Sequence, residues 1–129
     1  MKLLLDTHAL IWAVQSPERL GERARTALST NDAEVYASHV SLWEMAIKRR
    51  AGTLDELDRR AADWFDHFVP RSGFRQLPIA ASHLGAVEDL PFFHNDPFDR
   101  LLVTQAHQGD MTLVTSDGLV SQYDIEVIW

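Results

Sequence analysis

The chain has 129 residues, of which 46% are hydrophobic and 24% charged, the composition of a folded globular protein rather than a disordered or fibrous one. It contains no cysteine, which excludes disulfides and thiolate zinc sites, and its net charge of −7, taken alone, argues against a nucleic-acid binder. We expect one cytoplasmic domain over residues 1–129, with no membrane association, because Asp6 comes too early for a secretory signal and no stretch is long enough to span a bilayer.

Short apolar runs alternate with helical spacings along the chain. The first half predicts, in order, a strand at 3–5, helices at 9–14 and 20–28, a strand at 34–37 and a helix at 42–50 closed by Gly52. A capping box at 53–56 predicts another helix, which ends before Pro70. The second half predicts a strand at 76–79, a helix at 80–87, a loop at 91–93, a helix at 98–107 and strands at 112–115 and 126–129. This alternation is typical of an α/β fold with a parallel β-sheet.

The start of the helix at 98–107 is the most informative stretch. Proline is favoured in the first turn of a helix, so Asp96 is predicted as the N-cap and Pro97 as the first helical residue. Asp99 then lies in the first turn, near the positive end of the helix dipole.

Three more acids lie at or soon after strand ends: Asp6, Glu44 and Asp117. Because parallel strands end at the same edge of a sheet, we expect these acids to meet Asp99 there. Clustered carboxylates repel each other by roughly 1 to 4 kcal/mol per close pair, and a divalent cation relieves that repulsion. The spacing therefore predicts a metal site built from carboxylates.

Each acid taken singly also has a purely structural explanation. Asp6 can cap the first helix, Asp117-Gly118 is a common turn pair, and 41–44 and 96–99 both resemble capping boxes. Ser or Asn would serve as caps without mutual repulsion, so the occurrence of all four acids favours the metal site.

Four segments then carry a family resemblance: Leu4-Leu5-Asp6-Thr7-His8, Val40 to Lys48, Asp96 to Leu102, and Leu113-Val114-Thr115-Ser116-Asp117. In this order and spacing they resemble PIN-domain proteins, and within that group the VapC toxins of type II toxin–antitoxin pairs. The resemblance runs from residue 2 to Trp129. It implies a PIN fold with helices on both faces of the sheet, RNA cleavage that depends on Mg²⁺ or Mn²⁺, a cognate VapB-type antitoxin and a homodimer.

The resemblance also implies roles for individual residues. Asp6, Glu44, Asp99 and Asp117 match the acidic quartet of the family, with Asp6 and Asp99 at the positions of the main metal ligands. Mg²⁺ prefers such oxygen ligands and retains several waters, which the other two acids can position. A second tier comprises Asp96, an extra acid that is either a cap or a ligand; Thr115 and Ser116, near a phosphate or water; and Arg100, which either contacts the phosphate or, as we favour, forms a salt bridge with a neighbouring acid.

Other polar and aromatic clusters are less decisive. Lys48-Arg49-Arg50 fits a solvated helix face and an RNA groove equally well. The histidines have no metal-ligand spacing, and for His8 and His94 we favour surface or capping roles. The aromatic residues at helical spacings, among them Trp12, Trp43 and Trp64, are expected in the core or in a dimer interface, and a base-stacking role for one of them stays open. The helices around these three are expected to form a groove for an antitoxin segment.

Two other functional classes were weighed against a nuclease. An aspartyl-phosphate enzyme or receiver domain is disfavoured, because His8 stands where a second acid is expected and no lysine follows Lys48. A catalytically inactive PIN-like module that binds RNA or protein stays open as the alternative. The sequence does not indicate which RNA is cleaved.

Overall fold

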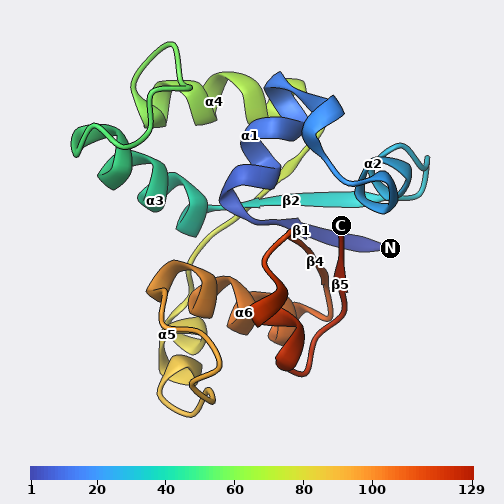
Figure 1. Cartoon of the computed structure of the whole chain (residues 1–129), viewed down its shortest axis with the longest axis vertical. Helices are drawn as coiled ribbons and strands as arrows, with labels where there is room; N and C mark the ends of the chain where they lie inside the picture. Colours follow the sequence, from blue (N-terminus) through green and yellow to red (C-terminus); the bar gives the residue numbers. More distant parts are fainter.

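The computed structural model describes residues 1–129 and contains a five-stranded sheet in the order β3-β2-β1-β4-β5 (Figure 1). Every pair of neighbouring strands is parallel, as predicted. Leu3 of the central strand lies opposite Val35 on one side and Thr112 on the other. The strands are β1 (Lys2–Leu5), β2 (Glu34–Ser38), β3 (Arg75–Leu77), β4 (Thr112–Val114) and β5 (Val127–Ile128).

Helices cover both faces of this sheet (Figure 1). One side carries α1 (Thr7–Gln15), α2 (Glu22–Leu28), α3 (His39–Arg50) and α4 (Ala61–Arg71), and the other carries α5 (Ala81–Val87) and α6 (Pro97–Gly109). Two short 3₁₀ helices, η1 (Pro17–Arg19) and η2 (Gly118–Gln122), complete the structure. None of the helices is long and apolar enough to cross a membrane.

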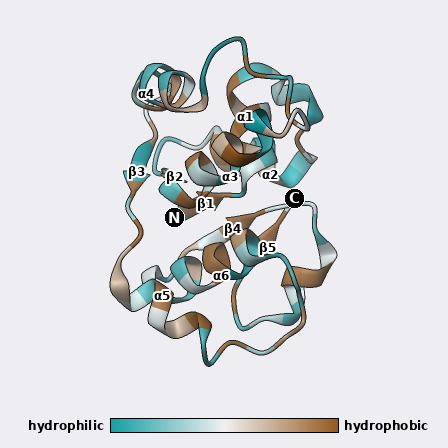
Figure 2. Cartoon of the chain, turned by 90° about the vertical axis from the view of Figure 1, so that its left-hand side faces the viewer, coloured by the Kyte–Doolittle hydropathy of each residue, from teal (hydrophilic) through white to brown (hydrophobic).

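Alternation along β1 divides the core into two hydrophobic clusters. Leu3 and Leu5 pack with Trp64 and other residues under α1 and α4, whereas Leu4 packs against α6. Each of these leucines is fully buried, which stabilises the fold by about 1.5–3 kcal/mol per side chain. Figure 2 shows the hydrophobic residues gathered where the helices meet the sheet. The central strand therefore holds both layers together.

The connection between α3 and α4 differs from the prediction. Residues 53–60 form no helix, because the backbone N–H and hydroxyl of Thr53 both donate to the Lys48 carbonyl (3.0 and 3.2 Å) and so close α3 instead of opening a new helix. Leu54 and Leu57 are still buried, from an extended segment. The predicted end before Pro70 is also wrong: the helix runs to Arg71, since a proline in the last turn removes only one helical hydrogen bond.

The start of α3 was also misplaced by three residues. Ser38 is the N-cap, with its Oγ accepting from the Val40 N–H at 2.9 Å, so β2 passes directly into the helix. The 41–44 capping box is therefore wrong, and Glu44 lies in the second turn of α3. Gly52, with φ of +79°, follows the end of α3 as predicted.

Strand order reverses at β1, which continues to β2 on one side and has β4 on its other edge. In open parallel sheets, ligands bind beyond the carboxyl ends of the strands at such a reversal. Asp6 directly follows β1, and Asp117 follows β4 by three residues. The fold thus places two of the predicted acids at the position where a ligand site is expected.

Candidate active site

All four predicted acids line one hollow of about 300 Å³ at this edge of the sheet. We call it the acidic hollow. Its lining consists of Asp6, Thr7, His8, Trp12, Glu44, Lys48, Asp96, Asp99, Ser116 and Asp117. Five of these ten residues are acids, drawn from β1, α3, α6 and the segment after β4. The topology therefore brings together carboxylates that are more than 100 residues apart in sequence.

Asp6 serves the fold and the hollow at once. Its Oδ1 accepts the Ala9 N–H at 2.8 Å, which caps α1 as the structural explanation predicted. Burial raises the pKa of Asp6, and hydrogen bonds from the Thr115 hydroxyl and the Ala9 N–H offset part of that rise. A buried carboxylate in this state is stabilised by any cation that enters the hollow.

Glu44 is only 5% exposed, and both of its carboxylate oxygens have partners. Oε1 accepts from the Thr7 hydroxyl at 2.6 Å, and Oε2 accepts from the Lys48 ammonium at 2.5 Å. The hydrogen bond to Glu44 raises the pKa of Lys48. These two donors hold Glu44 in one orientation at the wall of the hollow.

Asp96 and Asp99 have different surroundings at the start of α6. Asp96 is the N-cap as predicted, with Oδ1 accepting from the N–H groups of Phe98 (2.8 Å) and Asp99 (3.1 Å). Burial raises the pKa of Asp99 to about 7, with further repulsion from Asp96, Asp6 and Glu44. Asp99, like Asp6, is thus a carboxylate whose negative charge is disfavoured by its burial.

His94 joins two of the acids. Its Nε2 lies 2.6 Å from Oδ2 of Asp117 and 3.2 Å from Oδ2 of Asp99, and the side chain is 11% exposed. Of the surface and capping roles expected for His94, the surface role is therefore wrong, whereas the side chain does accept the backbone N–H of Asp96, the N-cap of α6. These three residues lie close enough to share an ion, but Nδ1 of His94 accepts the Asp96 N–H at 3.0 Å. The ring proton must then sit on Nε2, so His94 is a hydrogen-bond donor to the acids rather than a metal ligand.

The segment after β4 completes the hollow. Partial burial raises the pKa of Asp117, but hydrogen bonds from His94 and from the Leu119 N–H outweigh it, and the net pKa is lowered. Thr115 is buried, donates to Asp6 and accepts the Asp117 N–H at 3.1 Å. Ser116 lines the hollow itself. Thr115 therefore connects Asp6 to the backbone of Asp117, and Ser116 contributes to the lining of the hollow.

Arg100 lies elsewhere than expected. Its side chain is buried, and it forms neither the salt bridge with an acid nor a surface to which a phosphate has access. The guanidinium packs 4.0 Å from the Phe92 ring centroid and donates to main-chain oxygens and a phenol. Its acceptors are the carbonyls of Val87, Leu90, Pro91 and His94 and the hydroxyl of Tyr123. Arg100 thus holds the 87–94 loop, which carries His94.

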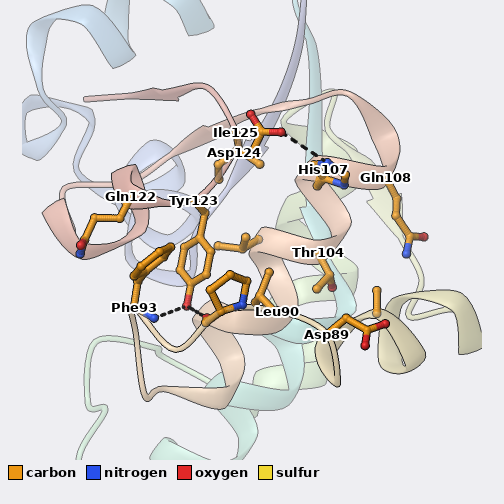
Figure 3. A pocket seen from close by; sticks show the side chains of 13 residues that line it. Asp89, Leu90, Phe93, Thr104, His107, Gln108, Gln122, Tyr123, Asp124 and Ile125 are labelled. Atoms are coloured by element: carbon orange, nitrogen blue, oxygen red, sulfur yellow. Dashed lines mark hydrogen bonds and ion pairs between the residues drawn. The ribbon is translucent and has the colours of Figure 1, made fainter.

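Tyr123 holds the same loop from its other side. Its hydroxyl donates to the Pro91 carbonyl at 2.7 Å and accepts the N–H groups of Phe93 and His94, both at 3.1 Å. Figure 3 shows Tyr123 pointing at this loop from the wall of a second hollow of about 440 Å³. That hollow is larger, but it contains none of the four predicted acids. The predicted acids therefore lie together in the smaller acidic hollow.

The three tryptophans do not share a groove. Trp64 is fully buried in the core and donates to Gln15 Oε1 at 2.7 Å. Trp12 lines the acidic hollow, whereas Trp43 lines a different hollow between α3 and α4. The predicted antitoxin groove around all three is therefore wrong, because one of them has no surface to offer.

Sequence reasoning found the acids but missed most of their supports. His94, Lys48, Thr7 and Tyr123 were not predicted to act at the site. The position of His94 two residues before the N-cap was the available signal, since a side chain there can turn back onto the start of the helix. Tyr123 had no local signal, because its partners are about 30 residues away.

The sequence matches the PIN domain family over residues 3–126. A chain of VapBC2 from Rickettsia felis, crystallised with a DNA fragment from their promoter, has a TM-score of 0.72 at 15% identity and covers 100% of this chain and 99% of that one. FitAcB from Neisseria gonorrhoeae has a TM-score of 0.66 at 17% identity, with coverage of 98% and 96%. DNA-bound VapBC from Salmonella typhimurium has a TM-score of 0.66 at 17% identity, with coverage of 99% and 97%. No curated protein matches the sequence.

Proposed function

The chain belongs to the PIN domain family, and from this premise we propose that it is a metal-dependent endoribonuclease, the toxin of a type II toxin–antitoxin pair. One observation carries the proposal: carboxylates from four separate elements line a single hollow at the carboxyl edge of the sheet. Such an arrangement is costly unless a cation neutralises it. A fold that needed only helix caps would gain nothing from bringing the acids together.

The donor set fits Mg²⁺, with Mn²⁺ as a substitute. It offers carboxylate and hydroxyl oxygens, and the one histidine that points at it carries a proton on the facing nitrogen. Asp6 and Asp99 would hold the ion directly, and Glu44 and Asp117 would act on its waters or on a second ion. When bound, the ion supplies polarisation of a phosphoryl oxygen and activation of a water.

The protein's own residues orient this set. The proton on Nε2 of His94 is donated to Oδ2 of Asp117, and the same nitrogen lies 3.2 Å from Oδ2 of Asp99. Lys48 and Thr7 fix the two oxygens of Glu44. Ser116, which lines the same hollow, would contact a phosphate oxygen or a water. No covalent nucleophile is required, so the reaction we propose is hydrolysis of an RNA phosphodiester by water.

Metal-dependent cleavage of a synthetic RNA by the purified protein tests this proposal. Asp6→Asn and Asp99→Asn should each lower the cleavage rate at least about 100-fold, because each removes a metal ligand. Asp124→Asn, at a fully exposed acid, is the matched control and should cleave normally. Mg²⁺ should also raise the melting temperature of the wild type, since an ion bound only by the folded state stabilises it. RNA binding without any cleavage would favour an inactive binding module instead.

The regulatory partner follows from the same proposal. Two of the similar solved structures are titled as VapBC assemblies, which supports a VapB-type antitoxin for this chain too. We also propose a homodimer and action in the cytoplasm. Co-expression with the product of the neighbouring gene should relieve toxicity, and light scattering should give twice 14.7 kDa. Sequencing of new RNA 5′ ends after induction would identify the target. A monomer, or a neighbour that neither binds nor relieves toxicity, would contradict these claims.

A further inference from the structure

Three exposed arginines line one hollow of this acidic protein. A hollow of about 430 Å³ between α3 and the start of α4, which we call the arginine groove, is lined by Arg49, Arg50 and Arg60. All three side chains are exposed, and none of them forms a salt bridge. Arg59, next in sequence, is by contrast paired with Asp58 at 2.9 Å. In a chain of net charge −7, three unpaired guanidinium groups on one hollow form a distinct anion-attracting surface.

An exposed aromatic side chain forms one wall of this groove. Trp43 is 47% exposed, although most large hydrophobic side chains of the chain are covered. The floor beside it is apolar and is made of Leu42, Ala46 and Ala61. An indole face next to guanidinium groups is the combination that holds a nucleotide, because the base stacks on the ring while the cations contact phosphates.

Trp43 also connects the groove to the acidic hollow. Its ring packs edge-on against Phe98, with centroids 4.8 Å apart and an interplanar angle of 79°. Phe98 lies between Asp96 and Asp99, which line the acidic hollow. Glu44, the residue after Trp43, lines that hollow too. A strand that leaves the acidic hollow over the start of α6 therefore meets Trp43 first and the arginines next.

We propose that the arginine groove binds single-stranded RNA on one side of the scissile phosphate, with a base stacked on Trp43 and backbone phosphates on the three arginines. This proposal rests on the proposed ribonuclease function. A single strand fits better than a duplex, because only an unpaired base can turn its face onto the indole. An acidic protein segment would satisfy the arginines, but it would not explain an aromatic wall that continues into the acidic hollow.

Binding of a fluorescein-labelled, unstructured 20-nucleotide RNA, measured by anisotropy in EDTA so that no cleavage occurs, tests the groove directly. Arg49→Gln/Arg50→Gln/Arg60→Gln should weaken binding at least about 10-fold and flatten the plot of log Kd against log salt by about 2, from a slope of about 0.7 per phosphate contact on single strands. Trp43→Ala should weaken binding about 5- to 100-fold, and Trp43→Phe should restore most of it.

The charge-matched control is Arg23→Gln/Arg25→Gln/Arg71→Gln, which removes three exposed arginines outside the groove. It should change the affinity less than about twofold. The proposal would be overturned if the groove variants and the control variant bound RNA with equal affinity. It would also be overturned if the groove variants bound RNA normally but no longer bound a co-expressed protein partner. If Trp43→Ala weakened the binding of a duplex RNA as much as that of the single strand, the assignment to single-stranded RNA would be overturned.

Hydrolysis of the small diester bis(p-nitrophenyl) phosphate separates this proposal from the ribonuclease function. It needs the acidic hollow but not the groove, so groove variants should retain the wild-type rate while their kcat/KM on the 20-nucleotide RNA falls with the binding. A wild type that hydrolyses neither substrate but shows the predicted binding pattern would refute the nuclease and retain the groove. Groove variants with wild-type kcat/KM on the RNA would refute the groove and retain the nuclease.

Discussion

The carboxyl group of Asp99 ionises at a much higher pH than an ordinary aspartate. Burial and three neighbouring acids raise its pKa to about 7, whereas the cap residue three positions earlier accepts two backbone N–H groups. Two acids at the start of one helix therefore have different roles: Asp96 accepts hydrogen bonds from the helix backbone, whereas the charged form of Asp99 is disfavoured unless a cation neutralises it. Both were predicted from the run around Pro97, because helix capping depends on adjacent residues.

The pKa of Asp99 predicts a pH dependence of stability in EDTA. Its folded pKa of about 7 exceeds the ordinary 3.8, so the folded state binds the proton more tightly. The stabilisation that the protonated carboxyl of Asp99 contributes is then fully present below about pH 4. That contribution falls by up to about 4 kcal/mol as the pH rises to 7. Asp99→Asn removes this dependence, so the variant should melt above the wild type at pH 8 and close to it at pH 4. Thermal melts across that range check this, with Asp124→Asn as the control; parallel curves would contradict it.

Asp96 and Asp99 should separate under substitution. Asp96→Asn and Asp96→Ser retain an oxygen that accepts the N–H groups of Phe98 and Asp99, so stability should change by less than about 1 kcal/mol and RNA cleavage should persist. Asp99→Ser should lose cleavage although serine is acceptable in a first helical turn. Denaturant melts and cleavage rates on both variants make the comparison. Equal loss of cleavage at both positions would make Asp96 a ligand as well.

At the scale of elements, the 87–94 loop determines whether His94 reaches the acids. Arg100 holds it through four carbonyl oxygens, and Tyr123 holds it through one carbonyl and two N–H groups. A buried guanidinium without a carboxylate partner is stable only because its donors are satisfied in this way. The loop is therefore part of the site although it contributes a single side chain to it.

Tyr123→Phe should show this coupling. Loss of the hydroxyl leaves the N–H groups of Phe93 and His94 without their acceptor, which should lower the free energy of unfolding by about 1–3 kcal/mol. RNA cleavage should fall by more than the loss of folded protein explains, because His94 is then less well placed. Urea unfolding and cleavage rates measure the two effects. Tyr36→Phe, at the other tyrosine, is the control, and identical behaviour of the two variants would contradict the role.

Element prediction succeeded where local rules decide and failed where they compete. The strands and the start of α6 follow from apolar runs and a proline, so the edge that gathers the acids was predictable. Thr53 satisfied the capping-box pattern, but its hydroxyl closes the preceding helix instead. Lys48 supports Glu44 from four residues along the same helix, a spacing that the sequence did show. Tyr123 and Thr7, by contrast, reach their partners only because distant elements pack together. Spacing along the chain does not specify that packing.

At the scale of the whole molecule, the last residue is packed against the start of α2. Trp129 lies over Gly21 and contacts the ring of Trp12, with centroids 5.8 Å apart. Trp12 in turn lines the acidic hollow. The residue that follows the edge strand β5 therefore packs, through the rings of Trp129 and Trp12, against the wall of the acidic hollow.

Gly21→Ala tests that packing. A Cβ at this position would lie 2.3 Å from a backbone atom of Trp129, so the chain end must move, and we expect a loss of about 1–3 kcal/mol of stability. Gly85→Ala is the matched control, because nothing lies within 4 Å of its Cβ and alanine favours the helix, so it should be neutral or stabilising by up to about 1 kcal/mol. Chemical denaturation measures the free energy of unfolding of both variants. Equal values would show that Trp129 can move away from Gly21 without loss of stability.

The strand order β3-β2-β1-β4-β5 also determines when the acidic hollow can assemble during synthesis. The first three strands in sequence form one side of the sheet. Asp6, after β1, and Glu44, in α3, belong to this part of the chain, whereas Asp99 and Asp117 come only with α6 and the segment after β4. Docking of β4 onto the free edge of β1 is therefore the step that meets the repulsion among the acids. A chain synthesised only as far as β3 carries two of the four predicted acids, Asp6 and Glu44. The acidic hollow is complete only after α6 and the segment after β4 have also been synthesised.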